Sequence, residues 1–264
     1  MELIRNSALE LAISAKLSQK LNAQIVPFCY KEVNSVLEVA KTLTDLLPEQ
    51  VALVLAESQS AGRGQQGRTW TSVKGAFLGC LLFPNCTIEK KDLSAFSLVV
   101  SLQIAKTLQE YGIEVATKWP NDVLIEKNNK KISGVLLETD SDSNGAGYSL
   151  RIGIGVNLVD YPEGGSSAYE ECGKKISIEE FAAKLASRCL AAFEIYTQKG
   201  FKEFEPAWNR LDILIGREIS FQYGDKIVSG VVSGVDINGN ICIKTKSEVL
   251  SFATGQILEW AKED

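Results

Sequence analysis

A glycine-rich segment with two arginines is the first part of the sequence whose residue types suit chemistry. It reads AGRGQQGR, from Ala61 to Arg68, and it directly follows the short apolar run VALVLAE. Glycine allows a backbone to approach a ligand closely, while Arg63 and Arg68 add fixed positive charge. The segment matches neither GxxxxGK[ST] nor a GxGxxG that opens a helix, so the common nucleotide-binding folds are not supported. It predicts a loop that binds an anionic ligand, with an ordinary surface loop as the alternative.

A second segment of interest, KWPND, runs from Lys118 to Asp122 and interrupts any helix. Asp122 is either a functional carboxylate or an Asx-turn residue that bonds its own backbone. Lys118 and Lys131 can supply positive charge to a site, although an exposed surface cation is the usual role of a lysine. Trp70 and Trp119 are either walls of a ligand site or aromatic residues of the core.

The residue types that are absent or scattered narrow the chemistry further. The 264 residues include no histidine, which excludes a Ser-His-Asp triad, a histidine base and a histidine-ligated metal. None of the six cysteines forms a CxxC pair, and most lie in apolar stretches, so buried thiols are favoured over metal ligands. The net charge of -5 argues against nonspecific affinity for nucleic acid.

The elements that position these residues can be predicted from periodicity and turn signals. We expect helices over residues 8–22, 33–47, 92–111 and 177–200, the last capped by Ser177 and ended by Gly200. We expect strands at 51–57, 75–83, 131–139 and 149–158, with a strand-turn-strand arrangement around KWPND. Residues 216–260 consist of short alternating runs joined by Gly-Asp, Asn-Gly-Asn and Thr-Gly turns, which is typical of a small β-barrel. We therefore expect a boundary near residue 213.

Four segments in a fixed order resemble the biotin protein ligase family. AESQSAGRGQQGRTWTS is similar to the family segment AExQxAGRGRRGRxWxS, and KWPNDVL, KKISGVLLE and GIGVNL resemble three further signatures. Together they span roughly residues 56–158, while YKEVNSVLEVAK and residues 213–262 resemble the family's flanking regions more weakly. The resemblance implies an α/β (α+β) fold: residues 1–212 form a class II synthetase-like catalytic domain with a mixed sheet and helices, and residues 213–264 form an SH3-like barrel.

The reaction implied by this resemblance has two steps. Biotin and ATP, with Mg²⁺, give biotinyl-5′-AMP and diphosphate, and a lysine of a biotin carboxyl carrier protein domain then displaces AMP. The carboxylate must approach a polyphosphate, so the site needs cations that offset repulsion and stabilise charge developing on the α-phosphate. The resemblance assigns catalysis to Lys131, Asp122 and Arg63, with Asp122 orienting or deprotonating the incoming lysine amine.

The resemblance also assigns the binding residues, position by position. Those implied for biotin are Ser35, Gln59, Gly62, Arg63, Trp119, Lys131 and Gly134. Those implied for the nucleotide are Arg63, Arg68, Trp70, Lys118, Asn121 and Asn157. Residues that ligate a metal are not identified by the sequence.

The sequence departs from the family pattern at two places. The family's Ser-Thr-Asn is Ser35-Val36-Leu37 here, which predicts a weakened or rearranged recognition of the ureido group. Two loop arginines of the family are Gln65 and Gln66 here, which predicts weaker retention of the adenylate. These departures leave a lipoate or octanoate ligase or transferase of the same fold as the alternative.

Partners and location complete the expectations. A transcription-repressing relative would need roughly 60 further residues before the first motif to form a winged helix, so we expect no DNA binding. The resemblance suggests a homodimer, at least with ligand bound. With no apolar run of about 20 residues and no signal-peptide pattern, we expect a soluble cytoplasmic protein without membrane contact.

Overall fold

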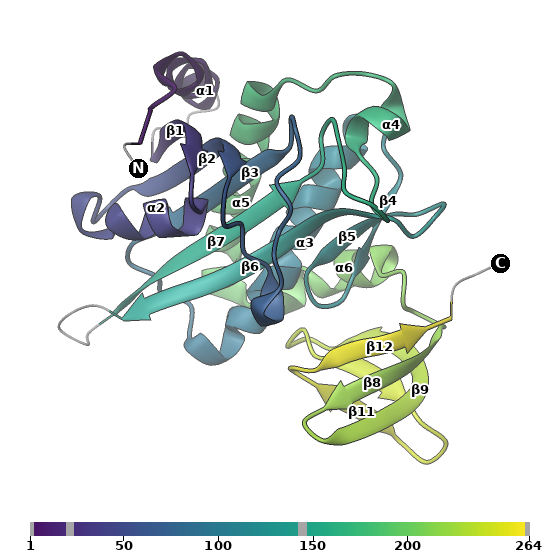
Figure 1. Ribbon diagram of the computed structural model, residues 1–264. Helices are drawn as coiled ribbons and strands as arrows, with labels where there is room; N and C mark the ends of the chain where they lie inside the picture. The colour runs from purple at the N-terminus through teal and green to yellow at the C-terminus, as the bar shows by residue number, and fades with distance from the viewer. Residues whose placement is uncertain (1–2, 20–23, 142–146, 262–264) are drawn as a thin grey trace.

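The structure is a computed structural model that describes residues 3–19, 24–141 and 147–261. Its largest feature is a seven-stranded sheet with the strand order β1-β2-β3-β7-β6-β5-β4 (Figure 1). Only the pair β1 and β2 is parallel, and all other neighbours are antiparallel. The strands are β1 (Ile25–Val33), β2 (Val51–Gln59), β3 (Phe77–Phe83), β4 (Val115–Lys118), β5 (Asp122–Ile125), β6 (Lys131–Ser141) and β7 (Tyr148–Val156).

Helices cover the two faces of this sheet unequally. Long apolar helices α3 and α5 lie behind the sheet in Figure 1 and share one core with its strands, whereas the short helix α2 packs on the opposite face with a separate core. The helices are α1 (Ser7–Gln19), α2 (Val36–Thr42), α3 (Leu93–Gln109), α4 (Ala168–Cys172), α5 (Ile178–Lys199) and α6 (Glu205–Leu211). Short 3₁₀ turns are η1 (Thr44–Leu46), η2 (Gln65–Gly67), η3 (Lys90–Asp92) and η4 (Phe201–Glu203).

The C-terminal residues form a second, five-stranded antiparallel sheet with the order β11-β10-β9-β8-β12. Its strands are β8 (Glu218–Tyr223), β9 (Lys226–Val235), β10 (Ile241–Lys244), β11 (Val249–Phe252) and β12 (Gln256–Trp260). Phe221 and Ile243 are fully buried at its centre. Gly224 and Gly239 lie in its turns with φ values of 58° and 79°, where a glycine avoids the cost of a left-handed backbone.

The second sheet is joined to the first through β4, α6 and the turn after β4. The Trp119 indole N–H donates to the Gly239 carbonyl (3.2 Å), and its ring lies 5.8 Å from that of Phe221. On α6, the Asn209 side chain bonds the backbone N–H and carbonyl of Val235 (2.8 and 3.1 Å). These buried contacts fix the barrel below β5 and α6 in Figure 1.

Most predicted elements are confirmed, and two differ. Helix α5 has Ser177 as its cap and ends at Gly200, as expected. The helix expected over 33–47 is shorter, because β1 extends to Val33 and α2 ends at Thr42. Strand β1 itself was not predicted; Pro27 lies within it, which is tolerated because β1 is at the sheet edge. Residues 20–22 of the first expected helix lie outside the described residues.

Within the described parts of the chain, no helix combines the length and apolar character needed to cross a bilayer.

Candidate active site

A cavity of about 130 Å³ lies on the α2 face of the large sheet, between α2, the glycine-rich loop and strands β5 to β7. Eight of the residues that the sequence assigned to a site line it: Gln59, Arg63, Arg68, Trp70, Asn121, Asp122, Lys131 and Gly134. The other lining residues are Val36, Leu37, Gly64, Gln65, Thr69, Gly79, Val135, Leu136, Gly153, Ile154 and Gly155.

Glycines on two strands create the space for this cavity. On β7, Ile152 and Ile154 point into the core with α3 and α5, so Gly153 and Gly155 between them face α2. A Cβ at Gly155 would lie 2.2 Å from the Trp70 ring, and one at Gly153 would lie 3.1 Å from Leu37. Alternation on β7 therefore gives a buried core on one face and a flat floor for Trp70 and Leu37 on the other.

A lysine and an aspartate meet at one end of the cavity. Lys131 Nζ lies 2.5 Å from Asp122 Oδ1 and 5.7 Å from the centre of the Trp70 ring. Asp122 of β5 pairs with Gly134 of β6, and Lys131 pairs with Leu124. The Lys131 side chain passes over Gly134, where a Cβ would lie 3.1 Å from Nζ, and in this way it reaches Asp122. The neighbouring Asn121 amide donates to the Val135 carbonyl (2.7 Å), which fixes the turn beside them. The Lys131 side chain is 42% exposed, so its ammonium remains accessible to a ligand.

The glycine-rich loop is held by hydrogen bonds between its own two ends. Trp70 N–H donates to the Gly62 carbonyl (3.0 Å), Gly64 N–H donates to the Arg68 carbonyl (2.8 Å), and Arg63 bridges Thr69 between them. A Cβ at Gly62 would lie 2.5 Å from the Trp70 carbonyl oxygen, so only glycine fits there. The loop is thus a small hairpin that carries Arg63 and Arg68 to the cavity.

The opposite end of the cavity is apolar and is shaped by the start of α2. Ser35 caps the helix by accepting from Leu37 N–H (3.3 Å), and Val36 N–H donates to Gln59 Oε1 (2.9 Å). Val36 and Leu37 are each 3% exposed and line the cavity. The two positions that depart from the family pattern therefore make this end more hydrophobic.

A second cavity of about 210 Å³ adjoins the first and shares Thr69, Trp70 and Lys131 with it. Asn157, 2% exposed, lines it and donates from its amide nitrogen to the Ser166 carbonyl (3.0 Å). The buried Asn157 Oδ1 and Trp70 Nε1 have no hydrogen-bond partner among the described residues. Buried polar atoms usually have partners, so a ligand with its own donors and acceptors suits this space.

Five of the sequence-assigned residues, Trp119 among them, lie outside the lining of the first cavity. Ser35 caps the helix whose Val36 and Leu37 line the cavity, and Gly62 allows the close approach of the Trp70 backbone. Asn157 lines the second cavity. Lys118 lies with its ammonium 5.7 Å from the Trp260 ring centre.

The structure places Trp119 outside both of these cavities. It was expected to wall the biotin ring, yet it lines neither the cavity beside Lys131 nor the one beside Asn157. Its side chain is 2% exposed and contacts the C-terminal sheet. The proline that follows it starts the turn, so Trp119 faces the barrel while Asn121 and Asp122 face the cavity.

Sequence reasoning missed the carboxylates that hold Arg63. Its guanidinium lies 2.7 Å from Glu38 and 3.1 Å from Glu138. The signal was present, because Gly134, Leu136 and Glu138 alternate along β6 and therefore share one face of the strand.

A buried carboxyl near the barrel has a strongly altered acidity. Burial raises the pKa of Asp212 from 3.8 to about 6, although hydrogen bonds from the Leu214 N–H and the Trp208 indole, and the nearby Lys118, act in the opposite direction. Asp212 also bridges Thr117 of β4, so it belongs to the junction between the two sheets.

Among the described residues, no group of three or more His, Cys, Asp and Glu side chains is placed to hold a metal ion. Four of the six cysteines are buried, and Cys172 and Cys242 are half-buried. Burial raises the pKa of the Cys80 and Cys189 thiols to about 12, which suits packing roles.

Taken together, an apolar cavity that ends at a lysine and an arginine-bearing loop, beside a second cavity with unpaired polar atoms, defines a ligase-like site for a small acid. Residues 33–157 match the Biotin/lipoate A/B protein ligase family, and residues 214–258 match the Biotin protein ligase C terminal domain. A biotin–[acetyl-CoA-carboxylase] ligase of Paracoccus denitrificans is 30% identical over 207 residues, which cover 73% of this chain and 84% of that protein. The chain belongs to the biotin protein ligase family.

Two further comparisons agree with this membership. The bifunctional ligase/repressor BirA of Salmonella typhimurium is 30% identical over 77% of this chain, and the chain spans about 65% of that relative's length. A biotin protein ligase from Aquifex aeolicus, solved in complex with biotin and ATP, has a TM-score of 0.75 and 27% identity. That match covers 91% of this chain and all of the other, so the two share a fold over most of this chain.

Proposed function

We propose that this chain activates biotin with ATP to give biotinyl-5′-AMP and transfers the biotinyl group to a lysine of a biotin carboxyl carrier protein domain. The observation that carries the proposal is the Lys131–Asp122 pair at 2.5 Å, where the apolar cavity and the cavity of Asn157 share Lys131. An acid bound in the first cavity and a nucleotide bound in the second would meet at this lysine.

In the first step, a biotin carboxylate oxygen attacks the α-phosphorus of ATP and diphosphate leaves. Both reactants are anionic, so a cation between them lowers their repulsion and stabilises the charge that develops on the phosphoryl oxygens. We propose that Lys131 takes this position, because it lines both cavities, and that Arg63 and Arg68 on the loop that lines the first cavity add positive charge. We propose Lys131 as the principal catalytic residue and Lys118 as a nucleotide contact.

In the second step, the acceptor amine attacks the carbonyl carbon of the mixed anhydride and AMP leaves. A lysine amine is mostly protonated near pH 7 and must lose a proton before it attacks. Asp122, whose side chain is 20% exposed at the cavity, is placed to orient the ammonium group or accept its proton. Lys131 would then stabilise the oxyanion and the leaving phosphate.

The binding roles follow from the same division. We propose that Val36, Leu37 and Gly134 contact the apolar tail of biotin, with Gln59 and the backbone near Gly62 and Ser35 serving its ureido ring. Trp70, Asn121 and Asn157 would contact the nucleotide, whose donors and acceptors would satisfy the unpaired atoms of Trp70 and Asn157.

Several finer points remain part of the proposal. Mg²⁺ would arrive with ATP and be held largely by phosphate oxygens, as is usual for this ion. We propose residues 1–212 as the catalytic domain and 213–264 as the barrel domain. A net charge of -5 supports the absence of DNA affinity, and an electrophoretic shift with the biotin operon promoter of the source cell would contradict it. A ligand-bound homodimer and a cytoplasmic location are also proposed, and free thiols suit that compartment.

The lipoate or octanoate alternative is not favoured, because the relative from Paracoccus denitrificans and the solved structure from Aquifex aeolicus are named for biotin. The proposal is tested by incubating the protein with biotin, ATP and Mg²⁺ and then adding a carrier domain. Mass spectrometry should detect biotinyl-AMP first and a biotinylated lysine after the addition. A carrier domain whose acceptor lysine is replaced by arginine should remain unmodified, and modification of that control would show nonspecific acylation instead.

A further inference from the structure

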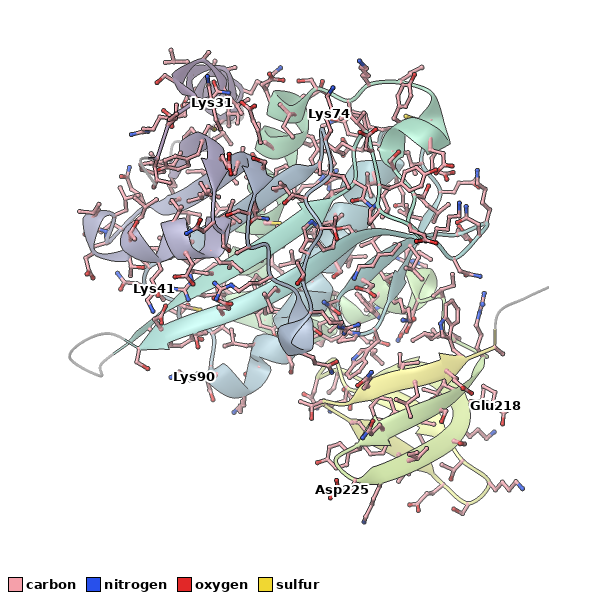
Figure 2. All side chains as sticks on the ribbon, in the orientation of Figure 1. Lys31, Lys41, Lys74, Lys90, Glu218 and Asp225 are labelled. Carbon is pink, nitrogen blue, oxygen red and sulfur yellow. The ribbon has the colours of Figure 1, made fainter. Side chains whose placement is uncertain are left out.

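Six charged side chains form one network beside the cavity. Three come from the sheet: Glu138 and Asp140 on β6, and Arg151 on β7. Glu38 and Lys41 come from α2, and Arg63 comes from the glycine-rich loop. Figure 2 shows Lys41 between α2 and the ends of β6 and β7, as its 3.1 Å contact with Asp140 requires. The network contains equal numbers of cations and carboxylates.

Arg63 connects three elements within this network. Its Nη2 lies 2.7 Å from Glu38 on α2 and 3.1 Å from Glu138 on β6. The same arginine lines the cavity together with Gly64, Gln65 and Arg68 of its loop. In this arrangement the loop already lies against the cavity, tied to both of its walls.

Glu138 is held by two arginines of this network. Its Oε2 accepts from Arg63 (3.1 Å) and from Arg151 Nη2 (3.2 Å), and the Arg151 side chain is only 4% exposed. Arg151 is also bonded to Asp140 and pairs directly across from Glu138 in the sheet. The buried arginine therefore fixes the carboxylate to which the more exposed Arg63 binds.

We infer that Glu138 is a positioning residue that fixes Arg63, and with it the glycine-rich loop, against the cavity proposed for biotin. The inference rests on the proposed function and adds a residue that contacts neither the cavity nor the reacting atoms. Glu138 holds the loop that lies against the cavity and does not contact the reacting atoms. Its loss should therefore weaken biotin binding and leave the chemical step largely unchanged.

The test compares Glu138→Gln with Asp140→Asn as a matched control. Both replacements remove one carboxylate from the same face of β6 and leave Arg151 with one acidic partner, but only Glu138 contacts Arg63. In biotin-dependent pyrophosphate exchange, Glu138→Gln should raise the KM for biotin about threefold to tenfold, with kcat within about twofold. Asp140→Asn should change neither by more than about twofold. Equal changes of the KM for biotin in the two variants, or a lower KM in Glu138→Gln, would overturn the inference.

A double-mutant cycle separates this role from a general structural one. Calorimetric titration with biotin should give the same dissociation constant for Arg63→Gln and for Arg63→Gln combined with Glu138→Gln, because the contact is already lost. Additive losses would mean that Glu138 acts elsewhere. If Glu138→Gln does not fold, added salt should weaken biotin binding more in the wild type than in Arg63→Gln, and equal salt dependence would refute the inference. Absence of biotin binding to the wild type would refute the proposed function instead.

Discussion

Replacing Lys131 by methionine removes the ammonium group and keeps most of the aliphatic stem, so it isolates the charge that the proposed mechanism requires. In the structure that charge has one carboxylate partner, Asp122 at 2.5 Å, and it lies where the two cavities meet. The variant should bind biotin through the unchanged apolar end and fail in adenylate formation.

The expected sizes of the two effects differ enough to be told apart. Lys131 is 42% exposed, and exposed ion pairs contribute only about 0.2–1 kcal/mol, so the free energy of unfolding should fall by less than about 1 kcal/mol. Removing one group aimed at charge in a transition state costs roughly a hundredfold to a thousandfold in rate, or about 3–4 kcal/mol. The unpaired Asp122 carboxylate would also repel the anionic substrates, which acts in the same direction.

The assay is single-turnover formation of biotinyl-AMP, run beside urea unfolding. Lys130→Met is the matched control, because the adjacent Lys130 ammonium lies 5.9 Å from the Tyr161 ring and lines neither of the two cavities. The control should retain its rate within about twofold. A Lys131→Met variant with more than half of the wild-type rate would refute the catalytic role, and a large loss of stability would reveal a structural one.

Four other variants give distinct results. Gln65→Arg should slow the dissociation of biotinyl-AMP several-fold in stopped-flow displacement, because a charge-assisted bond replaces a neutral one. Gln66→Arg should slow it less, and equal off-rates for wild type and Gln65→Arg would contradict the argument. Asp212→Asn should flatten the pH dependence of stability. With the folded pKa raised to about 6, the unfolded state loses the proton first, so wild-type stability falls by up to roughly 3 kcal/mol as pH rises from about 4 to 6. Urea unfolding across this range should therefore show the free energy of unfolding of Asp212→Asn rising relative to that of the wild type as pH increases, and parallel curves would exclude the effect. Trp119→Phe should lower the melting temperature by several degrees while the Kd for biotin stays within about twofold; a larger loss of affinity in calorimetry would return Trp119 to the site.

Much of the fold could be predicted because local signals and tertiary packing agree. Helix α5 has a serine cap, acidic residues in its first turn and a terminal glycine, so its limits follow from the sequence. Strand β1 has no such agreement. Its proline and its exposed Lys31 and Glu32 interrupt the apolar pattern, and tertiary pairing, chiefly the parallel pairing with β2, makes it a strand.

The candidate site was predictable where motifs carry local geometry and less so where tertiary packing decides. Lys131 and Asp122 lie nine residues apart in sequence, and the β5–β6 pairing brings them together. Trp119, only three residues before Asp122, points to the barrel because the turn reverses the chain between them. The contacts of Arg63 with Glu38 and Glu138 join residues 25 and 75 positions away. The alternation along β6 indicates which face Glu138 shares with Gly134, but only the tertiary packing brings Arg63 to it.

The most direct test of the account is ATP–pyrophosphate exchange by the wild-type protein, measured in parallel with biotin, lipoate and octanoate. Formation of a biotinyl adenylate is reversible in diphosphate, so labelled diphosphate should enter ATP only when biotin is present. The account predicts exchange with biotin and no more than background exchange with the other two acids. Exchange with lipoate or octanoate, and none with biotin, would contradict it.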